Sequence, residues 1–374
     1  MSKFRVGVAG SLVLDILPML AAGVDAEKLT SQGKLTECSG VMMYPGGEVG
    51  NTGLALRHLG ADVVLISKVG NDVAGEILQR LMERENAECS IRVLSGMSST
   101  VSIALALPGR DKSTLHSLGA SQTFTSEDLE KPLLEHLDWF HFGYPTSMKS
   151  LYRNNGEELV RMLEKVKQYK IGISLDTSLP DLHSESGKTD WRGILPKLLP
   201  LVDIFTPSVE ECLFMMDLDR YRKLAERHGS RDFTEVLTGD DVRELAEKAI
   251  SYGAKAVLMK CGKRGLYLKT NRLPSGDTRW NTREIFCPPC VPENMVSTTG
   301  AGDTAIAGFL QAFFLGRSPE QALKMAAFTA AQCIACPDTV SRIHNYAEME
   351  RLEKQSRHME NQGFLPGVTN AVQS

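Results

Sequence analysis

The sequence predicts an α/β fold, in which a mostly parallel central sheet is covered by helices and a small accessory β-sheet projects from it. Short apolar runs alternate with helical patterns over most of the 374 residues, an order that is typical of parallel sheets. Two extended stretches interrupt the alternation and are candidates for the accessory sheet. Neither an internal repeat nor a low-complexity linker divides the chain, so we expect one domain over residues 1–374.

Six short apolar runs predict the strands of the central sheet, and the helical patterns between them predict its covering helices. The predicted strands are residues 5–9, 62–68, 139–142, 171–175, 202–206 and 256–260. The predicted helices are residues 50–59, 75–85, 126–137, 155–168, 238–252 and 303–315. Thr125 or Ser126 is the expected cap of the third helix, because Asp128 follows in its first turn.

Residues 38–44 and 100–107 are extended in character, and turn-like Pro108 and Gly109 follow the second stretch. We expect a small sheet built from segments within about residues 14–45 and 98–118. Such a sheet would be a lid over a site at the carboxyl edge of the main sheet, where doubly wound folds bind ligands.

The composition is that of a globular protein, with 42% apolar and 24% charged residues. A net charge of −4 without long like-sign runs offers no footprint for nucleic acid or for an anionic membrane. Residues 6–24 follow Lys3 and Arg5 like a signal peptide, but Asp15 lies in the middle of that segment, where a membrane core disfavours a charge. We therefore expect a strand there and a cytoplasmic protein.

Eight cysteines are scattered through the chain and are expected to be reduced thiols. Cys287 with Cys290, and Cys333 with Cys336, form two C-x-x-C units that could serve a zinc site. The second pair lies in an alanine-rich helical run, where cysteine often serves as a small buried apolar residue. Burial is therefore the favoured interpretation, and zinc is the alternative.

The stretch from Thr298 to Asp303 is the most informative one, because Gly300 and Gly302 precede an apolar helix whose first turn carries Asp303. Glycines allow consecutive amide N–H groups to turn toward one point, and the positive end of the helix dipole favours an anion there. A carboxylate beside an anion hole is what phosphoryl transfer to an alcohol requires. The alternative is a capped helix after a glycine turn.

A second glycine-rich turn carries Gly46, Gly47 and Asn51 at the start of a predicted helix. It lacks the Lys-Ser/Thr of a P-loop and the dinucleotide glycine pattern, so neither nucleotide site is indicated. The Asn51 side chain offers donors and acceptors that suit neutral hydroxyls. A helix-capping turn explains the same residues equally well.

Together the two turns resemble the signatures of the ribokinase-like carbohydrate kinases, the phosphofructokinase B family. The first signature continues to Gly60, residues 69–72 and Gly75, and the second continues to Gly308 and Phe309. Their order and spacing hold from about residue 4 to residue 345. The resemblance implies a three-layer αβα core with a β-sheet lid, and ATP-dependent transfer of the γ-phosphoryl group to a hydroxyl of a small sugar or polyol.

The resemblance also implies roles for individual residues. Asp303 corresponds to the base, and Gly300, Ala301 and Gly302 correspond to the anion hole. The sugar-binding residues would be Asp15, Gly46, Gly47 and Asn51. The nucleotide-binding residues would be Ser208, Gly262, Lys263, Gly265 and Thr298, and Glu211 would hold Mg²⁺ through water. A homodimer joined through the lid is implied only by the resemblance.

Three positions depart from the family pattern. Ser297 replaces an aspartate that belongs to a monovalent-cation site in many members, which puts potassium activation in doubt. Ser208 replaces the asparagine of the Asn-x-x-Glu element, so the affinity for Mg²⁺-ATP could be lower. Residues 336–338 differ from the small-residue loop that often lies beside adenine, which leaves the base preference open.

Other functions stay open at this point: a kinase for a sugar acid, a sugar phosphate or a nucleoside, or a catalytically impaired sugar-binding regulator. An anionic acceptor would need a basic partner, for which Arg57, Arg92 and Arg110 are the candidates. A nucleoside would favour aromatic packing, which Tyr44, Phe142 or Tyr144 could supply.

Overall fold

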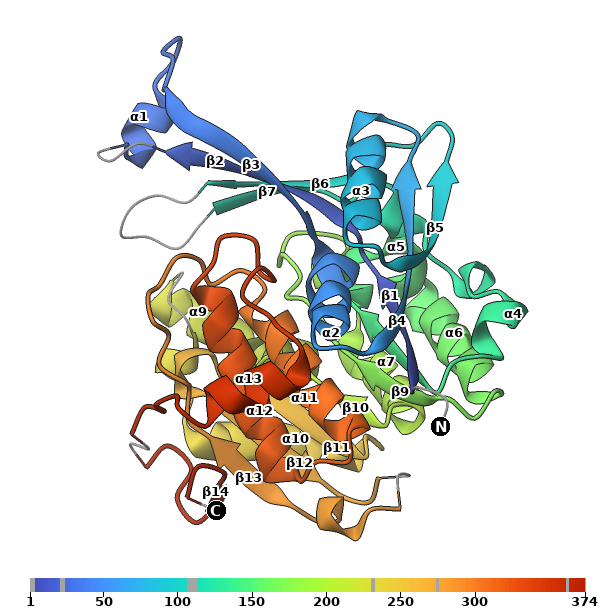
Figure 1. Cartoon of the computed structure of the whole chain (residues 1–374), viewed down its shortest axis with the longest axis vertical. Coiled ribbons are helices and arrows are strands. Elements are labelled where there is room, and N and C mark those ends of the chain that lie inside the picture. Colours follow the sequence, from blue (N-terminus) through green and yellow to red (C-terminus); the bar gives the residue numbers. More distant parts are fainter. Residues whose placement is uncertain are drawn as a thin grey trace.

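The computed structural model describes residues 4–20, 24–105, 113–229, 233–273, 276–360 and 363–373. Pro108, Gly109 and Arg110 lie outside the described residues. The predicted α/β architecture is confirmed, since a ten-stranded sheet runs through the molecule and helices cover its faces (Figure 1). Its strand order is β14-β13-β12-β11-β10-β9-β8-β1-β4-β5.

The central sheet is parallel over most of its width, because β12 alone runs against its neighbours β11 and β13. All six predicted strands are present, although the segment predicted at 202–206 pairs only over two residues. The strands are β1 (Arg5–Gly10), β4 (Asp62–Gly70), β5 (Glu88–Leu94), β8 (Trp139–Gly143), β9 (Gly172–Leu175), β10 (Ile204–Phe205), β11 (Ala256–Lys260), β12 (Leu266–Thr270), β13 (Glu284–Cys287) and β14 (Thr369–Asn370).

Two apolar cores flank the sheet, one beneath each layer of helices, so the molecule has three layers. One core includes residues of α4 (Lys131–Leu134), α5 (Lys149–Tyr152), α6 (Glu157–Lys167), α7 (Trp191–Leu198), α8 (Val209–Met216), α9 (Leu218–His228) and α10 (Gly239–Ser251). The other includes residues of α2 (Leu54–His58), α3 (Val73–Arg84), α11 (Ala301–Phe314), α12 (Pro319–Ile334) and α13 (Tyr346–Glu353). The short helix α1 (Ala26–Thr30) lies apart from both, beside the lid (Figure 1).

Two predicted helices differ from the structure. The segment predicted at 126–137 is a 3₁₀ turn followed by α4, because Pro132 favours a helix start and ends a preceding turn. Thr125 is the cap of that 3₁₀ turn, in a capping box with Asp128. The segment predicted at 50–59 is a π-helical turn, Val49–Gly53, that continues into α2.

The accessory sheet is present and has four strands in the order β3-β2-β6-β7. We call it the lid sheet; it consists of β2 (Val13–Leu20), β3 (Cys38–Gly46), β6 (Thr100–Leu105) and β7 (Ser113–Ser117). It projects from the main body on the side where β1 ends (Figure 1). Asp15 pairs with Tyr44 on β3 and with Ser102 on β6, so these three side chains share one face.

The opposite face of the lid sheet is apolar. Ile16 pairs with Met43 on one side and with Ile103 on the other, and Ile103 pairs with Leu115 on β7. The row therefore crosses all four strands, and Leu115 is 65% exposed. Elsewhere, no helix in the described part of the chain combines the length and the apolar content needed to cross a membrane.

Candidate active site

A cavity of about 1490 Å³ lies between the lid sheet and the carboxyl ends of β1 and β8, and the first turn of α11 closes it from below. The polar face of the lid sheet contributes Asp15, Tyr44, Ser102, Thr114 and His116. Of the residues predicted for the site, Asp15, Gly47, Asn51, Thr298, Gly300 and Asp303 line this cavity. Both glycine-rich turns thus meet in one place, although about 250 residues separate them in sequence (Asn51 and Asp303 are 252 apart).

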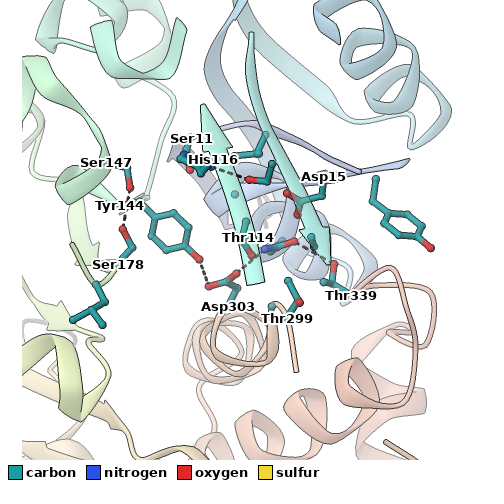
Figure 2. Close-up of a pocket in the computed structure, with 18 of the residues that line it drawn as sticks. Ser11, Asp15, Thr114, His116, Tyr144, Ser147, Ser178, Thr299, Asp303 and Thr339 are labelled. Carbon is teal, nitrogen blue, oxygen red and sulfur yellow. Dashed lines mark hydrogen bonds between the residues drawn. The ribbon is translucent and has the colours of Figure 1, made fainter. Parts of the chain in front are cut away.

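Asp303 lies at the floor of the cavity and is only 5% exposed. The Tyr144 phenol donates to Asp303 Oδ1 at 2.6 Å, and Asn51 Nδ2 donates to Asp303 Oδ2 at 2.7 Å. Figure 2 shows Tyr144 and Asp303 pointing toward one another. Burial raises the pKa of Asp303 to about 6, with a further contribution from the nearby Glu48. The carboxylate is therefore ionised at neutral pH and is a proton acceptor of moderate strength.

The π-helical turn fixes how Asn51 presents its amide. Thr339 Oγ1 donates to Asn51 Oδ1 at 3.2 Å, which leaves the Nδ2 group to face Asp303. Thr52 Oγ1 also donates to the Asp303 main-chain oxygen at 3.3 Å. Single π-helical turns often mark functional sites, because they redirect one side chain out of the helical repeat.

The turn into α11 needs glycine at position 300, and position 302 leaves little room for a side chain. Gly300 has a φ of 73°, and a Cβ there would lie 2.5 Å from Thr339 Cγ2. A Cβ on Gly302 would lie 3.2 Å from Lys260 Cδ. The first amides of a helix have no intrahelical acceptors, so the turn presents N–H groups at the positive end of α11, although the Ala301 N–H also donates to the Thr298 main-chain oxygen at 3.4 Å. This arrangement suits an anion beside Asp303.

A cluster of buried charges lies beneath this turn. Carboxylate oxygens of Glu48, Asp176 and Asp303 lie within 4.8 Å of one another. Lys260 Nζ donates to the two Asp176 oxygens at 2.7 and 2.9 Å. Burial raises the pKa of Asp176 well above its usual range, and its acidic neighbours raise the pKa of Lys260. A lysine thus supplies the positive charge among these acids, so we do not interpret the cluster as a metal site.

Glu48 extends the polar network behind the cavity. His141 Nε2 lies 2.8 Å from Glu48 Oε1, and His141 Nδ1 lies 2.7 Å from Ser174 Oγ. Trp139 Nε1 donates to the same Ser174 oxygen at 2.8 Å. Both His141 and Glu48 are fully buried. The network ties the second glycine turn to β8 and β9, the strands that end at the cavity.

The paired glycines before Asn51 let polar groups approach the main chain closely. A Cβ on Gly46 would overlap the Asp15 carboxylate. Gly47 has a φ of 72°, and a Cβ there would lie 2.6 Å from the Ser11 main-chain oxygen. Asp15, Gly47 and Asn51 line the same part of the cavity wall, and Figure 2 shows the Asp15 carboxylate there.

Ser208 and Glu211 form a capping box at the start of α8. Ser208 Oγ accepts from the Glu211 N–H at 3.1 Å, and Glu211 Oε2 accepts from the Ser208 N–H at 2.8 Å. Thr177 Oγ1 donates to the same Glu211 oxygen at 3.0 Å. The negative charge of Glu211 raises the pKa of both Asp176 and Lys260, so Glu211 lies near the buried charges beneath the turn into α11. A carboxylate in that position fits the water shell of Mg²⁺.

The loop predicted to border a nucleotide is a hairpin turn between β11 and β12. Gly262–Arg264 forms a 3₁₀ turn, and Gly265 has a φ of 112° with the Cys287 main-chain oxygen where a Cβ would be. Lys263 forms an ion pair with Glu235. Neither this loop nor Ser208 and Glu211 lines the cavity described above.

The cysteines do not form a converging ligand group in the described chain, where the three carboxylates are the only such group. Cys333 lies in α12 and its Sγ donates to the Thr299 main-chain oxygen at 3.1 Å. Cys287, Cys290 and Cys336 are buried. The nearby Ser297 Oγ donates to Thr299 Oγ1 at 3.1 Å and accepts from the Thr299 N–H at 3.2 Å, so its hydroxyl braces the loop before the anion hole.

Two of the candidate basic residues are engaged elsewhere. Arg57 Nε donates to the Glu85 main-chain oxygen at 2.7 Å, and Arg92 forms an ion pair with Asp128. Neither lines the cavity, and Arg110 lies outside the described residues. Of the aromatic candidates, Tyr44 and Tyr144 line the cavity, whereas Phe142 is fully buried.

The sequence analysis missed Asp176 and Lys260, and it named Tyr144 only as a possible aromatic partner of a nucleoside. Tyr144, Asp176 and Lys260 each lie at or directly after the carboxyl end of a strand of the central sheet. That position is a usable signal, since parallel sheets bind ligands at this edge. Glu48 is marked only by its place between the glycine pair and Asn51.

Comparisons with known proteins agree with this geometry. A model described as pfkB family carbohydrate kinase matches residues 12–345. An uncharacterized sugar kinase of Archaeoglobus fulgidus is 27% identical over 282 residues, which are 75% of this chain and 94% of that protein. The ATP-dependent 6-phosphofructokinase of Thermoanaerobacterium thermosaccharolyticum is 24% identical over 326 residues, 86% of this chain and 85% of that protein.

Solved structures show the same fold. Arabidopsis thaliana ribokinase, complexed with ribose and ATP, superposes with a TM-score of 0.68 at 19% identity and covers 94% of this chain and 99% of that chain. The fold is therefore ribokinase-like, with the lid sheet as the small separate sheet of that architecture.

Proposed function

Because the chain belongs to the pfkB family of carbohydrate kinases, we propose that it transfers the γ-phosphoryl group of ATP to a hydroxyl of a small sugar or polyol, with Asp303 as the base. The observation that carries this proposal is the buried Asp303 carboxylate between two donors, beside the amides of Gly300–Gly302 and on the floor of the cavity. Phosphoryl transfer depends mostly on such positioning and on charge stabilisation.

The reaction follows from these positions. The acceptor hydroxyl donates its proton to Asp303 while its oxygen forms a bond to the γ-phosphorus. The bond between that phosphorus and the bridging oxygen breaks, and ADP leaves with the bonding electron pair. The amides of Gly300, Ala301 and Gly302 stabilise the charge on the transferring group. An Asp303 pKa of about 6 keeps the base ionised at pH 7 and above.

Asp15, Gly46, Gly47 and Asn51 bind the sugar hydroxyls in this proposal. The charges on the described lining of the cavity favour an uncharged acceptor. The carboxylates that line it are Asp15, Asp181, Asp303 and Asp338, and no Lys or Arg is among the described lining residues. Burial lowers the pKa of His116, so the lid contributes a neutral imidazole at neutral pH. A second phosphate or a carboxylate on the acceptor would therefore meet repulsion.

The nucleotide is assigned to the region beyond the anion hole, with Ser208, Gly262, Lys263, Gly265 and Thr298 along its border. Glu211 holds Mg²⁺ through water in this assignment. Bound Mg²⁺ neutralises phosphate charge and, as a hard ion, keeps several waters and few protein ligands. The capping box between Ser208 and Glu211 supports it, because the box fixes the carboxylate near Asp176 and Lys260.

We propose that residues 1–374 form one kinase domain. Its lid segments, within residues 14–45 and 98–118, close over the sugar and exclude water from the site. Met43 and Leu115, the exposed ends of the apolar row, support a homodimer in which the lid sheets of two copies cover each other. Eight free thiols fit a reducing compartment such as the cytoplasm.

A coupled assay for ADP release tests the function, with a panel of free sugars, polyols, sugar acids, sugar phosphates and nucleosides. We expect turnover of uncharged polyhydroxylated acceptors, and a loss of about 10²–10⁴-fold in kcat for Asp303→Asn with little change in sugar binding. Binding of a sugar without turnover of any compound would instead favour a sugar-binding regulator.

A further inference from the structure

Among the described residues, Tyr144 is one of two side chains that donate a hydrogen bond to the Asp303 carboxylate, the other being Asn51. Its phenol lies 2.6 Å from Asp303 Oδ1, and the residue lines the cavity. The backbone of Tyr144 has a φ of 64°, which is uncommon for a residue with a side chain. Such strain persists only where the surroundings hold it, and it gathers at functional sites.

The surroundings hold this backbone firmly. The Tyr144 N–H donates to the Asp176 main-chain oxygen at 3.3 Å, and the Ser147 N–H donates to the Tyr144 main-chain oxygen at 2.9 Å. A Cβ on Gly143 would overlap the Glu48 carboxylate, so glycine is required directly before Tyr144. Glu48 is in turn bound to His141 two residues earlier on β8. The end of β8 is thus fixed from both sides, and it aims the Tyr144 ring at the base.

We propose that Tyr144 is a positioning residue for Asp303, whose phenol O–H and the Asn51 amide together hold the carboxylate in the orientation that accepts a proton from the acceptor hydroxyl. This inference rests on the proposed function of Asp303. Tyr144 acts through the base and keeps its own proton throughout, while the proton of the acceptor goes to Asp303. Two donors on different elements leave the carboxylate no freedom to turn.

The charged groups around Asp303 determine how the Tyr144 phenol affects the pKa of that carboxyl. Glu48 and Asp176 are the acids in the same cluster, and Lys260 is the cation. Glu211, Cys333 and, behind Glu48, His141 are further titratable groups near the cluster. Burial and the nearby acids raise the pKa of Tyr144 well above its usual range, so the phenol is always a donor at physiological pH. Its hydrogen bond stabilises ionised Asp303 and lowers the pKa of that carboxyl.

The first test compares the pH profile of kcat/KM for the wild type, Tyr144→Phe and the control Tyr44→Phe. Tyr44 also lines the cavity, but its hydroxyl donates to Met42 Sδ and not to the base. Loss of the Tyr144 hydroxyl should move the acidic limb up by about one pH unit, which is about a tenfold lower kcat/KM at the acid end. Above about pH 8, where Asp303 is ionised in both proteins, only the pH-independent loss from the freed carboxylate should remain. An acidic limb at the same pH in both proteins would overturn the proposal.

The second test needs no catalysis, so it separates this inference from the kinase assignment. A carboxyl with a raised folded pKa loses stability as pH rises through that pKa. Because Tyr144→Phe raises the pKa of Asp303 further, the stability gap between wild type and variant should widen between pH 5.5 and 8, as measured by urea unfolding. The gap for Tyr44→Phe should be constant. A constant gap for Tyr144→Phe would overturn the proposal even in an active enzyme, and a widening gap in an inactive protein would refute only the kinase assignment.

Discussion

Lys260 donates to both carboxylate oxygens of Asp176, at 2.7 and 2.9 Å, directly behind the glycine turn into α11. Its position on β11 brings the ammonium near Asp303 as well, and its charge lowers the pKa of that carboxyl. Without Lys260, the buried Asp176 would lose its cationic partner beside Glu48 and Asp303. Lys260 therefore affects both the stability of this edge of the sheet and the pKa of Asp303.

Lys260→Met should lower the free energy of unfolding by about 3–5 kcal/mol at pH 7, because it leaves buried carboxylates without their partner. Urea unfolding of the wild type and the variant measures this loss. Lys263→Met is the matched control, since Lys263 forms an exposed ion pair with Glu235 and its loss should cost less than about 1 kcal/mol. Equal effects of the two substitutions would contradict the buried-charge interpretation.

Asp303→Asn should change the free energy of unfolding in a pH-dependent way. Relative to the wild type, the variant should be more stable at alkaline pH than it is in acid. The pKa of Asp303 is raised from 3.8 to about 6, so its contribution to stability is intact below pH 3.8 and is lost as pH rises through 6. The difference in unfolding free energy should grow by about 2–3 kcal/mol in favour of the variant between pH 4 and pH 8.

Asp72→Asn should show the opposite pH trend in the stability difference between variant and wild type. Asp72 caps α3 and accepts from Gly75 and Ser99, and these hydrogen bonds lower its pKa. Its contribution is present above the ordinary pKa of aspartate and is lost in acid, so this variant should be least stable relative to wild type at high pH. Parallel pH trends for the two variants would contradict the assigned pKa shifts.

The sequence predicted the fold and the residues of the two glycine turns because both leave local marks. Apolar runs that alternate with helical patterns identify the strands, and glycines before a helix identify the turns around Asn51 and Asp303. The family resemblance added Asp15 to these turns, and Asp15, Asn51 and Asp303 all line the cavity. The sequence could also have predicted that the segment at 126–137 is not one continuous helix, because Pro132 interrupts it.

The residues that support the base could not be predicted in the same way. Tyr144, Asp176 and Lys260 end three different strands, and only the order of β8, β9, β10 and β11 in the sheet brings them together. No local pattern distinguishes a strand-end tyrosine that binds a carboxylate from one that packs in the core. The π-helical turn at Asn51 has no sequence signature either, because its register is set by contacts with Thr339 and Asp303.

Ser208→Asn should lower the Mg²⁺ concentration needed for half-maximal rate. Asparagine caps helices as well as serine does, so the variant keeps the capping box, and its longer amide reaches the water shell that Glu211 is proposed to hold. We expect an effect of roughly severalfold, in the range of outer-shell contributions to metal affinity. Initial rates at saturating sugar and ATP measure it.

Ser318→Asn is the control for that experiment, because Ser318 caps α12 through the same kind of capping box with Gln321, away from the cavity. Its half-saturating Mg²⁺ concentration should equal that of the wild type. An unchanged or higher requirement in Ser208→Asn would argue against a role of this position in metal binding.

The rate should be the same in potassium, sodium and choline salts at constant ionic strength. Ser297 is a neutral hydroxyl engaged with Thr299, and it brings no charge to the place where an aspartate would help hold a monovalent cation. Ser297→Asp restores that charge, so we expect this variant to be faster in potassium than in choline. Potassium activation of the wild type would show that another group supplies the site.

Leu115→Asp should convert a dimer into monomers. Leu115 is 65% exposed on β7, and it ends the apolar row that runs through Ile103 and Ile16 to Met43. Monomeric proteins seldom expose such a row, and a buried aspartate without a partner is costly, so the dissociation constant should rise at least tenfold, about 1.4 kcal/mol. Sedimentation velocity over a range of concentrations measures the change. Leu315→Asp is the control, because Leu315 is 49% exposed just after α11 and lies outside the lid sheet. A wild type that sediments as a monomer, or a dimer that Leu115→Asp leaves intact, would show that another surface or none joins the copies.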